Sequence, residues 1–93
     1  MVVGVLTVEL QVPASQSLKD KRQVIQSLTA RLRHEYNVAV AQVDHLDSWQ
    51  LATLGVACVS NDLAYVQGLL QHVVDYVESH PGTLLLDYST EYL

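Results

Sequence analysis

The first twelve residues alternate between two sets of side chains with a period of two. One set is wholly aliphatic and consists of Val2, Leu6, Val8, Leu10 and Val12. The other set is mixed and consists of Val3, Val5, Thr7, Glu9 and Gln11. A period of two is the repeat of a β-strand, whose neighbouring side chains point to opposite faces. The pattern predicts a strand over residues 2–12, which Pro13 ends.

The next segment changes to helical spacing. Ser17 is suited to be an N-cap, and Asp20 follows three positions later, as in a capping box with the shorter acid. Apolar residues then recur at intervals of three and four, at Leu18, Val24, Ile25, Leu28, Leu32 and Tyr36. This spacing predicts a helix from about residue 18 to residue 35.

Two further strands, a second helix and a last strand follow. Strands are predicted for residues 37–44 (NVAVAQVD) and 50–59 (QLATLGVACV), and a turn around HLDSW joins them. Residues 60–62 offer helix caps, and Val66, Leu70, Val73 and Val77 then follow at helical spacing. The segment His80-Pro81-Gly82 closes this helix, and residues 83–93 (TLLLDYSTEYL) predict the fourth strand.

The predicted order of elements is β-α-β-β-α-β. With right-handed crossovers, this order gives a four-stranded antiparallel sheet in the spatial order 4-1-3-2 with both helices on one face. The expected fold is therefore the ferredoxin-like α+β sandwich, built as a single domain over residues 1–93. A chain of this size buries roughly 60 to 65% of its unfolded surface, which is enough for one core.

One face of such a sheet has no helices over it. We expect that face to show Val3, Val5 and Thr7 from the first strand and Thr53 from the third, followed by Gly55 and Ala57. A partly apolar open face favours self-association, so these residues are the predicted interface of a homodimer or higher homo-oligomer. The alternative is ordinary surface apolarity, because single exposed apolar residues are common.

Composition places the chain among packed proteins. It is 49% apolar and 16% charged, and no apolar run reaches the 18 residues that a membrane span needs. The N-terminus has no basic segment and alternates, unlike a signal peptide. One cysteine, Cys58, cannot form an internal disulfide. We therefore expect a cytoplasmic protein with no membrane partner.

Charge is distributed very unevenly. All five lysines and arginines lie within residues 17–36, where the sum of charges is +3, and the rest of the chain sums to -8. The basic residues are Lys19, Lys21, Arg22, Arg31 and Arg33. An arrangement of this kind can steer an anionic partner to one face of the molecule.

Helical geometry places these cations on the first helix. Lys19, Arg22 and Arg33 share one flank and Arg31 lies on the other. Lys21 falls on the apolar side by angle, and we expect its stem to pack while its ammonium reaches water. Basic side chains at a helix N-terminus are repelled by the positive end of the helix dipole, so their presence there suggests that a bound phosphate stabilises them. We therefore predict that all five basic residues bind an anion or RNA. The alternative is a solvated helix face.

Evidence for catalysis or a cofactor is negative. The chain contains no phosphate-binding glycine loop, no C-x-x-C motif and no acylphosphatase-like loop. Asp44, His45 and Asp47 lie near a turn, but three such residues in a short loop more often form the turn than bind a metal. Cys58 has no base placed beside it, and Trp49 is interpreted as a partly buried staple over the hairpin. We expect no enzyme activity, no cofactor and no metal.

The segments SLKDKRQVIQSLTARLRHEYNVAVAQVD and WQLATLGVACVSND resemble the YlxP-like family, a group of small bacterial proteins of unknown function. The likeness covers nearly the whole chain and rests on the spacing of SLKxKR, RLR, NVxVA and SND. It implies a ferredoxin-like fold, a cytoplasmic bacterial protein and, for some members, genes among those for transcription and translation factors and the label of a ribosome-binding factor. The family pattern falls on Ser17, Leu18, Lys19, Lys21, Arg22, Arg31 and Asn37, and no catalytic role is established for any of them.

This chain departs from the family pattern at three positions. It has Tyr36 where Phe is expected, Ala39 where Ser is usual and Gln42 where Glu is common. The last two departures speak against a functional polar pair on the second strand.

Two main hypotheses about function follow, and an enzyme that acts on a phosphorylated metabolite is the third. In the first, the protein is a non-catalytic binding module that docks on rRNA or a ribosomal particle through the basic helix and dimerises through the sheet. In the second, it is a homo-oligomeric scaffolding or regulatory protein that binds another protein through the open sheet face.

Overall fold

The computed structural model describes residues 1–93 and confirms the predicted order of elements. Strand β1 covers Val2–Gln11, helix α1 Leu18–Glu35, strand β2 Ala39–Asp44, strand β3 Leu51–Ser60, helix α2 Leu63–Ser79 and strand β4 Leu84–Tyr92. Neither helix is long and apolar enough to cross a membrane.

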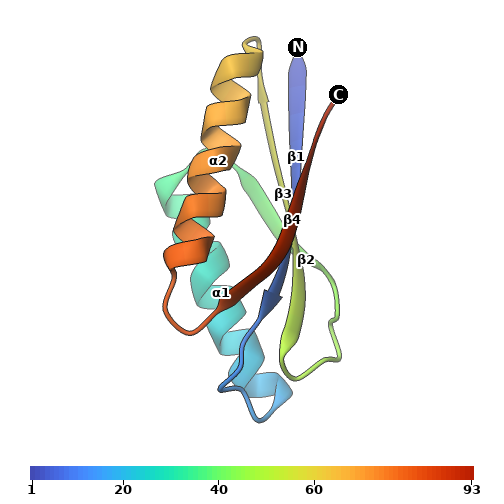
Figure 1. The fold of residues 1–93 in the computed structure, drawn as a ribbon, viewed down its shortest axis with the longest axis vertical. Coiled ribbons are helices and arrows are strands. Elements are labelled where there is room, and N and C mark those ends of the chain that lie inside the picture. The colour runs from blue at the N-terminus through green and yellow to red at the C-terminus, as the bar shows by residue number, and fades with distance from the viewer.

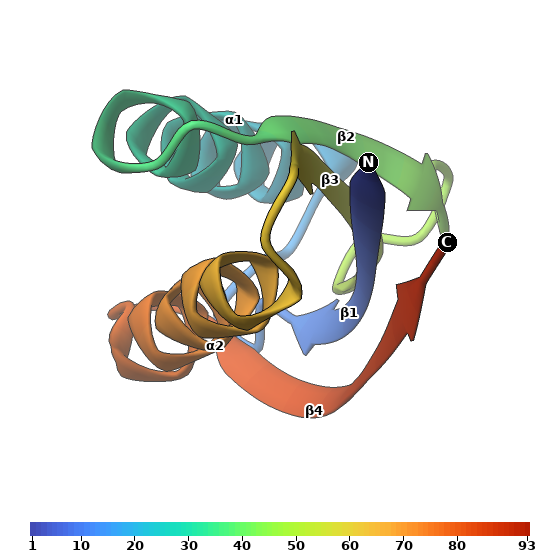
Figure 2. The same ribbon diagram turned by 90° about the horizontal axis from the view of Figure 1, so that it is seen from above.

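The four strands form one antiparallel sheet in the order β2-β3-β1-β4, which is the predicted order read from the other edge. The ferredoxin-like α+β fold is therefore confirmed. The longest pairing joins β1 to β3 along ten residues of each strand, so these two strands form the centre of the sheet. Both helices lie on one face of the sheet, and the opposite face has no helix over it (Figures 1 and 2).

Local signals in the sequence fix the ends of both helices. The Ser17 hydroxyl accepts a hydrogen bond from the backbone N–H of Asp20 at 3.1 Å, and the Asp20 carboxylate accepts one from the N–H of Gln16. Asp62 caps α2 in the same way through the N–H of Ala64. Such caps satisfy N–H groups that the first turn of a helix leaves without partners. Gly82, with φ of +86°, makes the turn into β4 in the left-handed region that glycine tolerates.

The core lies between the helices and the sheet. It consists of seventeen buried apolar residues, Leu6, Val8, Leu10, Val12, Ile25, Leu28, Leu32, Val40, Ala52, Leu54, Val56, Cys58, Val66, Leu70, Val73, Val74 and Val77. The aliphatic face predicted for β1 is thus the buried one, apart from the half-buried Val2 at its start. Between the helices, the rings of Tyr36 and Tyr76 pack edge to face with their centroids 6.0 Å apart.

The two edges of the sheet differ. At one edge, β2 lies alongside α1, while at the other edge β4 curves away from α2 toward its C-terminal end (Figure 2). An irregularity in the pairing of β1 with β4 falls between Glu9 and Leu10 and leaves Leu86 without a partner in β1. Bulges of this kind bend an edge strand and increase its twist.

Candidate functional site

Lys21 is the residue for which the sequence-based expectation is wrong. Its side chain has 0% exposure, so its ammonium does not reach water. The Nζ atom instead donates hydrogen bonds to the backbone carbonyls of His45, at 2.6 Å, and Leu51, at 3.0 Å. Burial lowers the pKa of Lys21, the positive charge of Arg22 lowers it further, and Asp47 acts in the opposite direction. As placed here, Lys21 cannot touch an RNA or any other anion at the surface.

The carbonyl groups that bind Lys21 flank the loop between β2 and β3. Ser48 helps to close this loop, because its N–H donates to the carbonyl of His45 and its hydroxyl accepts from the N–H of Leu51 at 3.0 Å. Gln50 ties the same loop to the segment before α1 through the carbonyl of Ser15. The loop is therefore built around a lysine ammonium supplied by the first turn of α1.

Arg33 is tied to the backbone as well. Its guanidinium, on an otherwise exposed side chain, donates a hydrogen bond to the carbonyl of Val40 in β2. This bond shows that the end of α1 that carries Arg33 lies against the β2 edge. Two of the five cations therefore connect α1 to the hairpin of β2 and β3.

The other three cations are exposed and have no hydrogen-bond partner. Lys19 and Arg22 lie in the first turns of α1, and Arg31 lies three turns later. Because an α-helix rises about 1.5 Å per residue, Arg22 and Arg31 are separated by roughly 14 Å along its axis. Acidic Asp20 and Asp47 lie at the same end as Lys19 and Arg22. The basic residues thus form two small groups and no single patch.

The open face of the sheet divides into an apolar half and an acidic half. The apolar half covers β2, β3 and the start of β1 and consists of Val3, Val5, Ala39, Ala41, Val43, Gly55, Ala57 and Val59. Six of them line a shallow hollow of about 290 Å³ together with the two buried valines Val40 and Val56. Val43 and Val59 are 58% and 57% exposed. We call this surface the apolar half-face.

The predicted interface residues are distributed as follows. Val3, Val5 and Thr7 are half-buried on the open face, as expected, and only the two valines belong to the apolar half-face. Thr53 also lies on this face, but it is only 5% exposed, because its hydroxyl donates to the carboxylate of Glu9 at 2.6 Å. Thr53 therefore offers almost no surface to a partner. Sequence reasoning missed the contribution of β2, although the alternation Ala39, Ala41, Val43 was visible as a signal.

The acidic half of the open face covers β4 and the adjoining part of β1. Glu9 lies directly opposite Asp87, and Val5 lies opposite Glu91, in the register of β1 and β4. Residues 1–11 and 34–93 contain no lysine or arginine, so the charged side chains of this half of the face are all negative.

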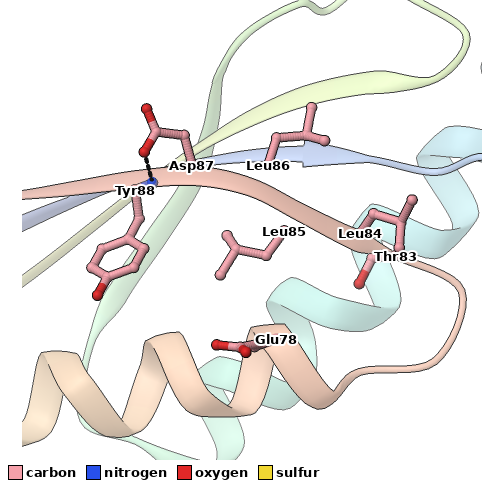
Figure 3. A pocket seen from close by; sticks show the side chains of 7 residues that line it. All are labelled: Glu78, Thr83, Leu84, Leu85, Leu86, Asp87 and Tyr88. Carbon is pink, nitrogen blue, oxygen red and sulfur yellow. Dashed lines mark hydrogen bonds between the residues drawn. The ribbon is translucent and has the colours of Figure 1, made fainter.

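An open cleft of about 400 Å³ lies between the start of β4 and the end of α2. Figure 3 shows that Leu85 and Tyr88 point from β4 toward α2, where Glu78 lies, while Asp87 points away. Tyr88 is 44% exposed although it is on the side of β4 that faces the helices. The cleft therefore combines an apolar floor with a carboxylate at its rim.

The other candidate residues lie apart from these surfaces. Asp44, His45 and Asp47 do not converge as a set of metal ligands. Trp49 is 58% exposed, so its interpretation as a partly buried staple is wrong. Burial raises the pKa of the Cys58 thiol, although the backbone N–H of Gly4 acts in the opposite direction, and a buried thiol of this kind is a poor nucleophile.

Comparison with known proteins gives two findings. Residues 3–90 match the family model described as "Protein of unknown function (DUF503)". The chain is also 29% identical over 79 residues to a protein of Bacillus subtilis (strain 168) named "Uncharacterized protein YlxP", a match that covers 85% of this chain and 86% of that protein. The resemblance noted in the sequence is thereby confirmed.

Proposed function

The chain belongs to the DUF503 family, and we propose that it acts as a non-catalytic binding module whose apolar half-face binds a second copy of the chain. The observation that carries this proposal is the continuity of the apolar half-face over three strands. Contiguous exposed apolar patches of this kind often mark a site of protein–protein interaction. The proposed place of action is the cytoplasm, where a lone thiol such as Cys58 stays reduced.

The size of the open face fits a second copy. The strands β1, β2, β3 and β4 have 10, 6, 10 and 9 residues. At about 3.3 Å per residue and about 4.8 Å between strands, the whole open face presents roughly 550 Å² in projection. Stable interfaces bury about 800 Å² of accessible surface per partner, and accessible surface exceeds projected area. The apolar half-face is about half of the open face, so a second copy placed face to face on it forms an interface at the small end of the range for protein–protein interfaces.

The side chains of the apolar half-face suit sheet-on-sheet packing. Small residues at its centre, Ala41, Gly55 and Ala57, allow two sheets to approach to the usual spacing of about 10 Å. Because Glu9, Asp87 and Glu91 occupy the other half of the face, a two-fold pairing centred on β2 and β3 keeps like charges apart.

The test is the mass of the protein in solution, measured by sedimentation equilibrium. We expect the wild type to be a dimer and the Ala41→Glu variant to be a monomer, because a carboxylate on this exposed alanine would be buried between the sheets. The Ser89→Glu variant adds the same charge to the acidic half and should remain a dimer. A monomeric wild type, or equal effects of the two variants, contradicts the proposal.

A second candidate function is contact with RNA, such as rRNA in a ribosomal particle. The observation that favours it is the exposure of Lys19, Arg22 and Arg31 without hydrogen-bond partners. Cations of this kind contact phosphates at a low cost in lost interactions. The proposed RNA-binding set is thus reduced to these three residues, with Lys21 excluded by burial and Arg33 tied to β2.

The test of this candidate must avoid Lys21, because its replacement would remove a fully buried side chain and its two hydrogen bonds. We propose sedimentation through sucrose gradients of the wild type and of the double variant Lys19→Gln, Arg22→Gln. The control variant Gln23→Glu, Ala30→Glu lowers the net charge by the same two units at other exposed positions of α1. Salt-sensitive migration with ribosomal particles that only the first variant loses supports RNA contact. Free migration of the wild type in low salt excludes it.

A further inference from the structure

The free edge of β4 exposes a defined set of backbone groups. Val3 and Leu93 exchange both of their backbone hydrogen bonds, at 3.0 and 2.8 Å, so the groups of Leu93 point toward β1. In an antiparallel pair, inward and outward residues alternate. The register therefore directs Asp87, Ser89 and Glu91 toward β1, and it directs the N–H and C=O groups of Tyr88, Thr90 and Tyr92 to the free edge.

One of these outward groups already has a partner. The N–H of Tyr88 donates to the Asp87 carboxylate at 2.9 Å, as Figure 3 shows. A carboxylate placed in this way guards the edge against another strand. The N–H groups of Thr90 and Tyr92 have no such guard, so the last part of β4 is the open part of this edge.

The side chains along this edge are unusually exposed on both faces. Every residue of β4 is exposed except the half-buried Leu85. On the side of the helices, Tyr88 and Tyr92 are 44% and 37% exposed, because β4 curves away from α2 (Figure 2). Leu84 and Leu86 are 51% and 53% exposed. The edge strand thus leaves apolar surface open beside backbone groups that lack partners.

The charges around this edge all have one sign. Asp87 and Glu91 lie on the open face of β4, and Glu78 lies at the cleft beside it. Since no lysine or arginine occurs after Arg33, none of these carboxylates forms an ion pair with a cation from residues 34–93. A basic partner segment would therefore complement the charge of this edge.

We propose that the free edge of β4 binds an extended segment of a partner protein by strand addition, and that this segment alternates apolar with basic residues. Residues opposite Tyr88, Thr90 and Tyr92 would point toward the helices and cover the two tyrosine rings. Residues opposite Asp87 and Glu91 would point to the open face, where lysine or arginine meets the carboxylates. Main-chain hydrogen bonds supply the attraction, and the alternation supplies the specificity.

The other edge of the sheet does not suit the same segment. At β2, the carbonyl of Val40 already accepts a hydrogen bond from Arg33. A basic segment placed there would meet that guanidinium. The distribution of charge therefore directs a basic strand to β4 and away from β2.

The test uses a synthetic peptide of alternating lysine and valine, with a peptide of alternating glutamate and valine as the control ligand. We expect the lysine peptide to bind and to slow hydrogen exchange at the amides of Thr90 and Tyr92. The Thr90→Pro variant removes one outward N–H and leaves the bonds to β1 intact, so it should weaken binding by about tenfold or more. The Thr90→Ala variant keeps that N–H and should bind like the wild type.

Several results would overturn this proposal. They are failure of the lysine peptide to bind the wild type, equal binding of the glutamate peptide, equal binding to Thr90→Pro and Thr90→Ala, or protection of β2 amides in place of β4 amides. If Thr90→Pro does not fold, the double variant Asp87→Lys, Glu91→Lys decides the question, since it should reverse the preference between the two peptides. None of these outcomes depends on the dimer proposed above, which Ala41→Glu tests on other strands.

Discussion

Both helices bury apolar side chains against the same sheet, but each also has a contact of its own kind. Helix α1 is tied by polar bonds, in which Lys21 binds two carbonyls beside the hairpin loop and Arg33 binds one carbonyl of β2. Helix α2 is held by close apolar contact, because β1 has a glycine, Gly4, directly under Val66. The contrast shows that part of the positive charge on α1 belongs to the architecture, whereas the carboxylates around α2 and β4 have no lysine or arginine of residues 34–93 to pair with, because none occurs there.

This difference has consequences for how each helix responds to mutation. A charged hydrogen bond is directional, so its loss leaves a specific acceptor without a donor. A close apolar contact depends on volume, so it is sensitive to added atoms. The following predictions test this contrast, in order of decreasing effect on the free energy of unfolding.

The largest effect is expected for Lys21→Ala. This change removes a fully buried side chain and both of its hydrogen bonds, and it should lower the free energy of unfolding by about 3 kcal/mol. The Lys21→Met variant keeps most of the volume and should lose about 2 kcal/mol, which is the part due to the bonds. Urea denaturation measures both values.

The matched control is Lys19→Ala, two residues earlier on the same helix, where the side chain is exposed. Its free energy of unfolding should change by less than about 0.5 kcal/mol. A result in which Lys19 and Lys21 matter equally would mean that the carbonyl bonds of Lys21 do not stabilise the fold.

The second effect concerns α2 and has the opposite character, since it comes from adding an atom. A Cβ at Gly4 would overlap Cγ1 of Val66, a fully buried residue, so Gly4→Ala should destabilise the protein by about 2 kcal/mol. The matched control is Gly68→Ala on the exposed side of α2, where a Cβ meets no atom. That change should stabilise the protein by about 0.5 to 1 kcal/mol, because alanine favours the helix. Thermal denaturation shows the opposite signs directly.

The sequence was sufficient for the fold because each element has its own local signal. The period of two in residues 2–12, the caps at Ser17 and Asp62 and the turn at Gly82 all agree with the final topology. Short-range signals of this kind are determined by a few neighbouring residues, so one sequence suffices to find them. The bulge at Leu86 was not predicted, because it depends on the pairing of β4 with β1.

The candidate surfaces were predicted less completely. Helical angle placed Lys21 on the buried side, but the general tendency of lysine to reach water led to the wrong expectation. Its acceptors are the carbonyls of His45 and Leu51, which lie 24 and 30 residues away in the sequence. Backbone carbonyl groups that lie so far away in the sequence cannot be identified as hydrogen-bond acceptors from the pattern of side chains. The exposure of β4 is likewise a result of its curvature, whereas the open face could be derived from topology and alternation alone.

The third prediction concerns the other polar tie of α1. Arg33→Gln removes the charged bond to the carbonyl of Val40 at a largely exposed position, so the free energy of unfolding should fall by about 1 kcal/mol. Arg31→Gln is the control, because Arg31 is exposed and has no such bond. If the two variants lose stability equally, the loss reflects helix propensity or net charge and the tie to β2 is not significant.

The smallest effect is a pH dependence located where the two helices meet. Burial lowers the pKa of His80, and the charge of Arg31 lowers it further. Below the ordinary pKa of about 6.5, the unfolded chain therefore takes up a proton that the folded chain refuses, so stability falls as the pH drops through this window. The His80→Phe variant keeps a ring beside Tyr76. It should flatten the dependence of the free energy of unfolding on pH, measured by urea denaturation over a range from about one unit above to about one unit below pH 6.5. Arg31→Gln should flatten it partly, because it removes the second cause and leaves burial in place. An unchanged slope in both variants would show that groups other than His80 produce the acid sensitivity.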